Sequence, residues 1–245
     1  MKKIIEVQDL YTRFADNIVH EGLNMHVNEG EIYGILGPSG CGKSTVLREM
    51  VMLQEFQKGK IEVLGYDVSD ISYDDAQRLR RNWGVLFQGG ALFSSLTLFE
   101  NIALPLEEYT DLDKKLIAEI VAYKIEIVGL NQSDAYLYPS QISGGMRKKA
   151  SLARALSLDP KLLFLDEPTS GLDPISAREF DRLILKLRDM LGLTIVMVSH
   201  DLKSIYDTLD RLAIIDNKVI VAEGKLDEVV SMDLPFIQTF FKADI

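Results

Sequence analysis

A glycine-rich run near the N-terminus has the residue types and the spacing of a phosphate-binding loop. Residues 37–45 read Gly-Pro-Ser-Gly-Cys-Gly-Lys-Ser-Thr, and they fit the pattern G-x-x-x-x-G-K-[ST] at Gly37, Gly42, Lys43 and Ser44. Glycines leave backbone N–H groups free to surround a phosphate, the lysine reaches the β- and γ-phosphates, and the serine hydroxyl is a ligand for Mg²⁺. The run therefore predicts nucleotide binding.

The sequence on either side of this loop agrees with that prediction. The apolar run 31–36 indicates a buried strand, and residues 44–50 indicate the first turns of a helix, whose N-terminus carries partial positive charge. Cys41 reads as a small filler residue inside the loop. However, a thiol beside a helix N-terminus can have a lowered pKa, so we expect alkylation of Cys41 to block nucleotide binding and bound nucleotide to protect it. We expect nucleotide to contact the whole loop: Gly37, Pro38, Ser39, Gly40, Cys41, Gly42, Lys43, Ser44 and Thr45.

Two carboxylates end a second apolar run, residues 161–167. Burying a carboxylate is costly unless a cation or hydrogen bonds compensate it. A Mg²⁺ ion near Ser44 would compensate Asp166, and Glu167, one residue later, would point elsewhere and could orient or deprotonate an attacking water. The alternative is an acidic cap of the next helix, and the phosphate-loop pattern in the same chain favours the catalytic interpretation.

Two further polar residues follow predicted strands. Gln88 comes after the run 83–87 and can reach Mg²⁺ or the attacking water. His200 follows the run 193–198, where an imidazole can contact a γ-phosphate. A single polar residue at a strand end usually does no more than end the strand in solvent. Gln88 and His200 are therefore candidates only because of their positions relative to the phosphate loop and the carboxylates.

A second helix N-terminus suited to anions lies in the run 142–146. Ser143 is a good N-cap, and Gly144 and Gly145 leave the backbone amides bare. An ordinary capped helix would look the same. However, a dimer that sandwiches nucleotide between two copies needs a second anion site of this kind, whereas a single nucleotide-binding domain does not.

The elements that must position these groups alternate between strands and helices, which predicts an α/β fold with a mostly parallel sheet. Residues 1–88 and 158–224 read as the core, 89–157 as an inserted helical lobe, and 225–245 as a tail of two short helices divided at Pro235. The predicted strands are 4–7, 23–27, 31–36, 60–64, 83–87, 161–165, 193–198, 211–215 and 219–222, and the predicted helices are 44–50, 74–81, 112–128 and 174–190.

Charge and composition limit the partners. The formal net charge is −10, so the chain repels nucleic acid and anionic lipid surfaces at long range, and we expect no nucleic-acid partner. A single cysteine excludes an intrachain disulfide framework and suits a reducing cytosol. No apolar run approaches the roughly 20 residues of a spanning helix.

Taken together and in this order, the motifs resemble those of the ATP-binding subunit of ABC transporters. The resemblance covers residues from about 4 to 224 and implies a P-loop NTPase fold with an N-terminal antiparallel β subdomain. It implies ATP hydrolysis with Mg²⁺ held by Ser44, Gln88 and Asp166. It also implies an aromatic side chain stacked on adenine, with Phe14 the first choice by spacing and Tyr11 the second.

The same resemblance implies a homodimer. Ser143, Gly144 and Gly145 of one subunit would close over the ATP held by the phosphate loop of the other, and residues 170–173 would lie at the seam. Catalysis would then rest on Glu167, with His200, Gln88 and Lys43 assisting.

A finer similarity is to the Mla and Mkl group of these ATPases. It rests on residues 86–106 and 143–149, with Met146 at a position where most of the family carries Gln. It implies phospholipid trafficking between inner and outer membranes, a multi-span permease and an MCE-domain lipid-binding protein as partners, and a peripheral place on the cytoplasmic face of the inner membrane. The alternatives are the ATPase of an importer for a small polar solute, a non-transport ABC ATPase, and a nucleotide-gated binding module that hardly hydrolyses ATP.

Overall fold

The computed structural model describes residues 2–241, which fall into two compact units. The first unit joins the residues up to Leu79 with those from Thr194 onward, and the second is Arg80–Leu193. Both units contain parallel strand pairs and helices, as expected for an α/β chain. Within residues 2–241, no helix is both long and apolar enough to cross a membrane.

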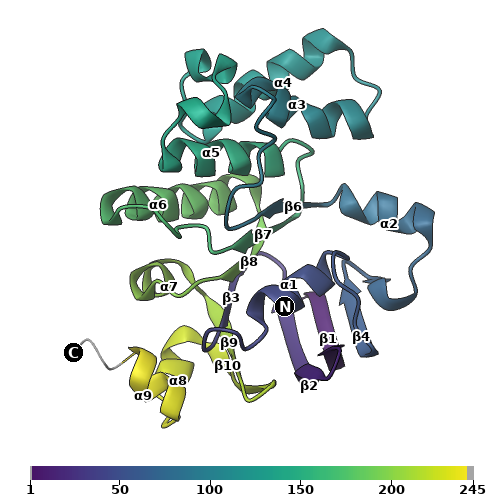
Figure 1. The fold of residues 1–245 in the computed structure, drawn as a ribbon, viewed down its shortest axis with the longest axis vertical. Coiled ribbons are helices and arrows are strands. Elements are labelled where there is room, and N and C mark those ends of the chain that lie inside the picture. The colour runs from purple at the N-terminus through teal and green to yellow at the C-terminus, as the bar shows by residue number, and fades with distance from the viewer. Residues whose placement is uncertain (1, 242–245) are drawn as a thin grey trace. The chain divides into compact units, whose positions relative to one another are not determined.

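The first unit contains two groups of paired strands (Figure 1). One is antiparallel, in the order β2-β1-β4-β5, and the other has the order β10-β9-β3-β8, with β3 parallel to both of its neighbours. Their bounds are β1 Lys3–Phe14, β2 Asn17–Asn28, β3 Ile32–Leu36, β4 Lys58–Val63, β5 Tyr66–Asp67, β8 Thr194–Val198, β9 Arg211–Asp216 and β10 Val219–Lys225.

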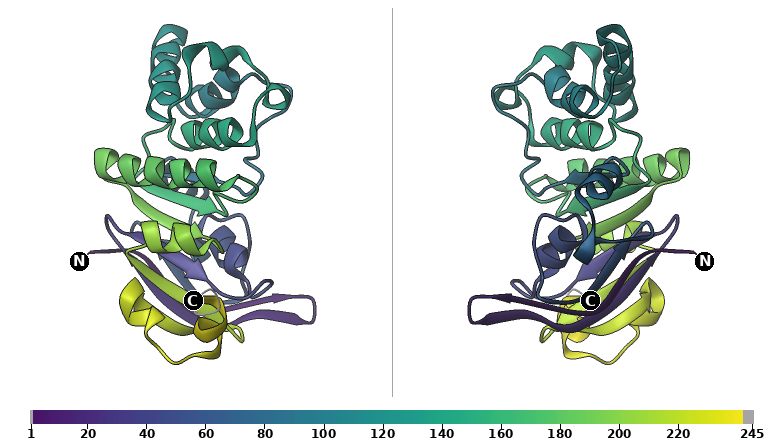
Figure 2. Two further views of the ribbon diagram at one scale, coloured as in Figure 1. Left: turned by 90° about the vertical axis from the view of Figure 1, so that its left-hand side faces the viewer. Right: turned by 90° about the vertical axis from the view of Figure 1, so that its right-hand side faces the viewer.

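The β1–β2 hairpin is much longer than the sequence pattern predicts, and Figure 2 shows it as an extended two-stranded ribbon. The alternation of buried and exposed residues that marks a strand breaks at Asp9, whose φ of 47° is left-handed. The register of β1 against β2 shifts between Val7 and Leu10 around this residue. Because a bulge of this kind reverses the faces of the following residues, the alternation cannot be followed through it.

The helices of the first unit are short. The two predicted in the tail are present, and they are divided at Pro235 as expected (Figure 1). The last four residues of the tail prediction lie outside the described residues. The bounds are α1 Lys43–Met50, η1 Val68–Asp70, α7 Leu202–Thr208, α8 Leu226–Val230 and α9 Pro235–Phe241, and α2 Tyr73–Arg80 ends at the boundary of the unit.

The second unit has one parallel strand pair and most of the helical residues. Three of its helices, α3, α4 and α5, cluster together in both views of Figure 2. The bounds are β6 Trp83–Leu86, α3 Leu98–Tyr109, α4 Lys114–Ile127, η2 Gln132–Tyr136, η3 Pro139–Gln141, α5 Gly144–Ala155, β7 Leu162–Asp166 and α6 Pro174–Leu191.

Capping residues set the helix ends of this unit. The predicted N-cap of α5 is confirmed, because Ser143 Oγ accepts a hydrogen bond from the Met146 N–H at 3.2 Å. Pro174 is the first residue of α6, as expected, and Asp173 caps that helix. The helix ends at Gly192, whose φ of 65° is left-handed.

Helix α3 has no counterpart among the helices predicted above. Its start carries a sequence signal, because Thr97 and Glu100 form a capping box in which each side chain bonds the other's backbone N–H. Leu98, the first residue of α3, is fully buried in a small core with Ile142 and Ala150, so the start of the helix packs into the interior of the unit.

The side chain of Asn101, on α3, fixes the loop that precedes the helix. It is fully buried, its amide nitrogen donates to the carbonyls of Phe93, Leu96 and Thr97 at 2.9–3.1 Å, and its oxygen accepts from the Phe93 N–H at 2.8 Å. One buried side chain therefore links four backbone groups of the loop.

We expect Asn101→Leu to lower the free energy of unfolding by about 2–3 kcal/mol, because the loop loses the four hydrogen bonds that this side chain makes to its backbone. Chemical denaturation followed by circular dichroism measures the change. The control is Glu108→Ala, an exposed position on the same helix, for which we expect less than about 0.5 kcal/mol. Equal stability of the two variants would show that Asn101 does not hold the loop.

Candidate active site

The glycines of the phosphate loop occupy conformations that other residues adopt only with strain. Gly37, Gly40 and Gly42 have φ values of 148°, 80° and 101°. A Cβ atom at Gly37 would lie 2.1 Å from the Ile215 carbonyl oxygen, which real atoms do not allow. The backbone thus curls between β3 and α1 in the way that the sequence pattern predicts.

The charged end of Lys43 lies inside this curl. Its Nζ atom donates to the carbonyl oxygens of Gly37 at 3.0 Å and of Pro38 at 2.8 Å. Gly42 is the N-cap of α1, so the first turn of the helix, with the Ser44 hydroxyl, begins directly at the loop. The lysine ammonium, the backbone N–H groups at the glycines and the helix N-terminus together fit a phosphate, and the Ser44 hydroxyl offers an oxygen ligand to a metal ion bound with it.

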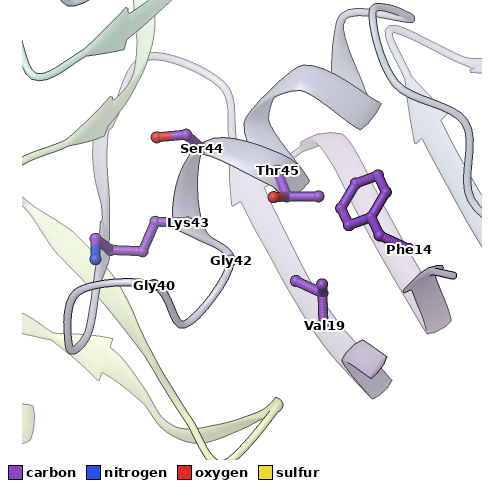
Figure 3. Close-up of a pocket in the computed structure, with 7 residues that line it drawn as sticks. All are labelled: Phe14, Val19, Gly40, Gly42, Lys43, Ser44 and Thr45. Carbon is purple, nitrogen blue, oxygen red and sulfur yellow. The ribbon is translucent and has the colours of Figure 1, made fainter. Parts of the chain in front are cut away.

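A cavity of about 290 Å³ opens beside the loop (Figure 3). The Phe14 and Val19 side chains from the β1–β2 hairpin form one wall, and Figure 3 shows them on the same side of the loop as Thr45, with Lys43 pointing to the opposite side. The Phe14 side chain is 42% exposed, so an apolar ring face is open to a ligand. Tyr11 does not line this cavity, and Lys58 Nζ lies over its ring at 5.7 Å.

His200 lies at the same edge of its sheet as the phosphate loop. Strands β3 and β8 are parallel, with Ile35 opposite Val198. The loop begins two residues after Ile35 and His200 comes two residues after Val198, so both leave the carboxyl ends of neighbouring strands. This is the edge where open α/β sheets bind ligands.

The second unit collects a separate set of candidate residues at the carboxyl ends of β6 and β7. Leu86 pairs with Leu165 in parallel register, so Gln88 and the carboxylates of Asp166 and Glu167 come from neighbouring strand ends. The Gln88 side-chain nitrogen donates to Ser170 Oγ at 3.3 Å. Asp166 is buried, with 3% of its surface exposed. Glu167 has a left-handed φ of 52°, a strained conformation that re-aims its side chain away from the strand direction.

A residue that sequence reasoning missed connects these groups. Lys148, on α5, is buried, and its Nζ donates to the backbone carbonyls of Gln88 at 2.5 Å and of Glu167 at 3.0 Å. Burial lowers the pKa of Lys148 to about 8, and the negative charges of Glu167 and Asp166 offset part of this effect. The signal was the basic turn that follows Ser143, which reads as a solvent-exposed helix face.

Ser143, which precedes two glycines, lines a second cavity of about 130 Å³ within the same unit. Its walls come from the start of α5 and from the segment that leads into α6. The residues that line it are Ser143, Gly145, Met146, Lys149, Leu172, Ser176, Glu179 and Phe180. The predicted anion site and the segment 170–173 thus lie next to one another.

Comparison with known families decides what these features belong to. Residues 20–170, from β2 to the segment after β7, match the ABC transporter family. The chain belongs to this family. It is an ATPase, and it is the subunit that couples ATP hydrolysis to transport.

Individual ABC proteins match over nearly the whole chain. The intermembrane phospholipid transport system ATP-binding protein MlaF of Haemophilus influenzae is 39% identical and covers 99% of this chain and 92% of its own length. The methionine import ATP-binding protein MetN of Clostridium tetani is 37% identical over 92% of this chain and 70% of its own. A solved dimeric ATP-binding cassette, MJ0796 bound to ADP and Pi, has a TM-score of 0.82 at 27% identity and covers 91% of this chain and 98% of its own.

The lowered pKa expected for Cys41 of this ABC ATPase is wrong. Burial raises the pKa of its thiol above the ordinary value, and the charge of Lys43 and a hydrogen bond with it offset only part of that effect. Desolvation of the thiolate inside the loop therefore outweighs the field of the helix N-terminus. At neutral pH the thiol is protonated and a poor nucleophile.

We expect alkylation of Cys41 by iodoacetamide to be slower than that of free cysteine at pH 7.5 and to accelerate about tenfold per pH unit toward the raised pKa, because only the thiolate reacts. Intact-mass spectrometry between pH 7.5 and 9.5 measures this rate, and the chain has only one cysteine. Cys41→Ala gives the background. Faster reaction than free cysteine at pH 7.5 would restore the lowered pKa.

Proposed function

We propose that this chain is the ATPase subunit of a transporter that moves phospholipid between the inner and outer membranes. The observation that carries the proposal is the 39% identity to a phospholipid transport ATPase, which extends over 99% of this chain. In the proposed complex, each copy of the chain is a single ABC ATPase domain, and two copies act together on the cytoplasmic face of the inner membrane. They act with a multi-span permease and an MCE-domain lipid-binding protein.

We propose that the phosphate loop, residues 37–45, grips the triphosphate, with Lys43 neutralising charge on the β- and γ-phosphates. Ser44, Gln88 and Asp166 are the proposed ligands of Mg²⁺, and their hydroxyl, amide and carboxylate oxygens suit that hard cation. A Mg²⁺ ion held by these residues would supply neutralisation of the negative charge on the phosphates. Phe14 stacks on adenine from the opposite wall of the cavity, which explains why a large apolar side chain is left exposed there.

The remaining proposed roles concern the attacking water and the γ-phosphate. We propose that Glu167 orients and deprotonates the attacking water, and that His200 donates a hydrogen bond to the γ-phosphate. Lys148 supports the first role, because it holds the backbone carbonyls of Glu167 and Gln88 on one ammonium group. The strained backbone of Glu167 is consistent with a side chain placed for catalysis.

The proposed dimer supplies the last contacts. Ser143, Gly144 and Gly145 of one copy close over the ATP of its partner, with residues 170–173 along the seam. Support comes from the small cavity at the start of α5, which the capping residue Ser143 and Gly145 line. The dimeric state of the related cassette, which contains ADP and Pi, also supports it. ATP that contacts both copies stabilises the closed state by its differential affinity for that state.

We expect Glu167→Gln to keep MgATP affinity within about twofold while kcat falls at least about 100-fold, because the change removes a base and no phosphate contact. Steady-state phosphate release and equilibrium binding of labelled ATP measure the two quantities. With MgATP, light scattering should detect a stable dimer of this variant.

Two controls accompany this variant. Lys43→Ala should lose ATP affinity as well as turnover, and Glu119→Gln, at an exposed position on α4, should behave as wild type. Hydrolysis by the Glu167 variant at the wild-type rate would remove that residue from the mechanism.

The transported substrate is tested on the intact complex. We expect the chain, affinity-purified from its native membranes in mild detergent, to bring with it a permease, an MCE-domain protein and bound phospholipid. Mass spectrometry of proteins and of extracted lipids gives the readout. The similarity to a methionine import ATPase makes the contrary result concrete. Recovery of a solute-binding protein with a polar ligand, and of no MCE-domain protein, would show an importer instead.

A further inference from the structure

A buried polar cluster beneath the phosphate loop has no part in the roles assigned above. It consists of Thr12 on β1, His20 on β2 and Glu49 on α1, which are 0%, 0% and 1% exposed. Three polar side chains from three elements are costly to bury together unless their hydrogen bonds are satisfied. His20 is the member of this cluster that contacts the phosphate loop.

Thr12 lies at the centre of the cluster. Its hydroxyl donates to Glu49 Oε1 at 2.6 Å, and His20 Nδ1 lies 3.1 Å from Thr12 Oγ1 and 3.4 Å from Glu49 Oε2. Within residues 2–241, Glu49 Oε2 has no hydrogen-bond partner, and the imidazole nitrogen Nδ1 lies beside it. The Nδ1 side of the ring is therefore held by the interior.

The other ring nitrogen faces the phosphate loop. His20 Nε2 lies 3.2 Å from the carbonyl oxygen of Gly42. A carbonyl only accepts hydrogen bonds, so Nε2 carries the hydrogen and donates it. The same oxygen accepts from the N–H groups of Thr45 and Val46, both at 3.0 Å, so the imidazole bonds the loop at the point where α1 begins.

The imidazole also fills the space behind that turn. A Cβ atom added at Gly42 would lie 2.4 Å from His20 Nε2, and Gly42 has a left-handed φ of 101°. Side chain and glycine therefore fit against each other without a gap. A shift of the ring would move the Gly42 carbonyl, and with it the N–H groups at the start of the helix.

The hairpin that carries His20 also carries the other wall of the cavity. Thr12 and His20 are cross-strand partners, and Val19, next to His20, and Phe14, two residues beyond Thr12, line the cavity together with Gly42 (Figure 3). The His20 imidazole thus connects the β1–β2 hairpin, which forms one wall of the cavity, with the phosphate loop at Gly42.

We propose that His20 is a positioning residue for nucleotide binding, whose Nε2–H holds the Gly42 carbonyl and so fixes the phosphate loop against the hairpin wall. The proposal rests on the proposed role of this loop in gripping the triphosphate. Because the hydrogen bond acts on the loop itself, its loss lowers affinity for the triphosphate whether or not a base is attached.

Two amide substitutions separate this role from a merely structural one. In His20→Gln the side-chain nitrogen reaches the place of Nε2 and keeps the bond to Gly42, whereas in His20→Asn it reaches only the place of Nδ1. Both variants disturb the buried cluster, so we expect similar losses of melting temperature. Calorimetric titration with MgATP and with Mg-tripolyphosphate, which has no base, measures the nucleotide and the phosphate affinities.

We expect His20→Asn to raise the Kd for both ligands by roughly fivefold to tenfold, the effect of losing one hydrogen bond, and His20→Gln to stay within about twofold of wild type. Phe14→Ala is the matched control on the other wall, and it should weaken MgATP but not tripolyphosphate. Equal Kd values for the asparagine and glutamine variants would overturn the proposal. So would an asparagine variant that loses affinity for MgATP alone.

A second variant without a donor to the Gly42 carbonyl covers the case in which His20→Asn does not fold. The double change His20→Leu with Glu49→Met replaces the polar pair by apolar side chains of similar volume, a replacement that buried pairs commonly tolerate. It should show the same loss for both ligands, and wild-type affinity would overturn the proposal. If the wild-type protein binds neither ligand, the proposed function of the loop fails as well. If the wild-type protein binds both ligands and the variants without a donor to Gly42 bind them equally well, only the role of His20 is rejected.

Discussion

The charge of a triphosphate is the constraint on which the rest of this structure depends. The chain has a net charge of −10, so its overall field opposes the ligand that an ABC ATPase must bind. The attraction has to be local. It comes from backbone N–H groups at glycines, the N-terminus of α1 and one ammonium group, Lys43, which the loop carbonyls hold in place. Such donors act over a few ångströms, where the screened field of distant carboxylates is weak.

Short-range donors bind a ligand well only if their positions are fixed. This requirement explains why buried polar contacts occur near the candidate residues. The Gly42 carbonyl is held by an enclosed imidazole in one unit, and the carbonyls of Gln88 and Glu167 are held by an enclosed lysine in the other. In both cases the polar or cationic side chain binds the backbone of the candidate residue. The desolvation that lowers the pKa of Lys148 to about 8 is the cost of placing it there.

How much the sequence could predict follows from the range of the interactions involved. The phosphate loop, the cap at Ser143 and the start of α6 at Pro174 depend on residues within a few positions of one another, so the printed order of residues contains the whole signal. The length of the β1–β2 hairpin depends on a bulge at Asp9, and the raised pKa of Cys41 depends on burial by the folded loop. Neither can be read from local spacing.

The cluster around His20 shows the same limit most clearly. Thr12, His20 and Glu49 are separated by 8 and 29 positions in a sequence of ordinary polar residues, and only the register of β1 against β2 and the packing of α1 bring them together. Glu49 even falls on the buried face of its helix beside Val46 and Met50, where pattern reasoning expects an apolar residue. The Thr12 hydroxyl donates a hydrogen bond to this buried carboxylate, and the imidazole packed beside both groups is the one that bonds the loop. In this fold the exception to the hydrophobic pattern therefore marks the contact that positions the phosphate loop.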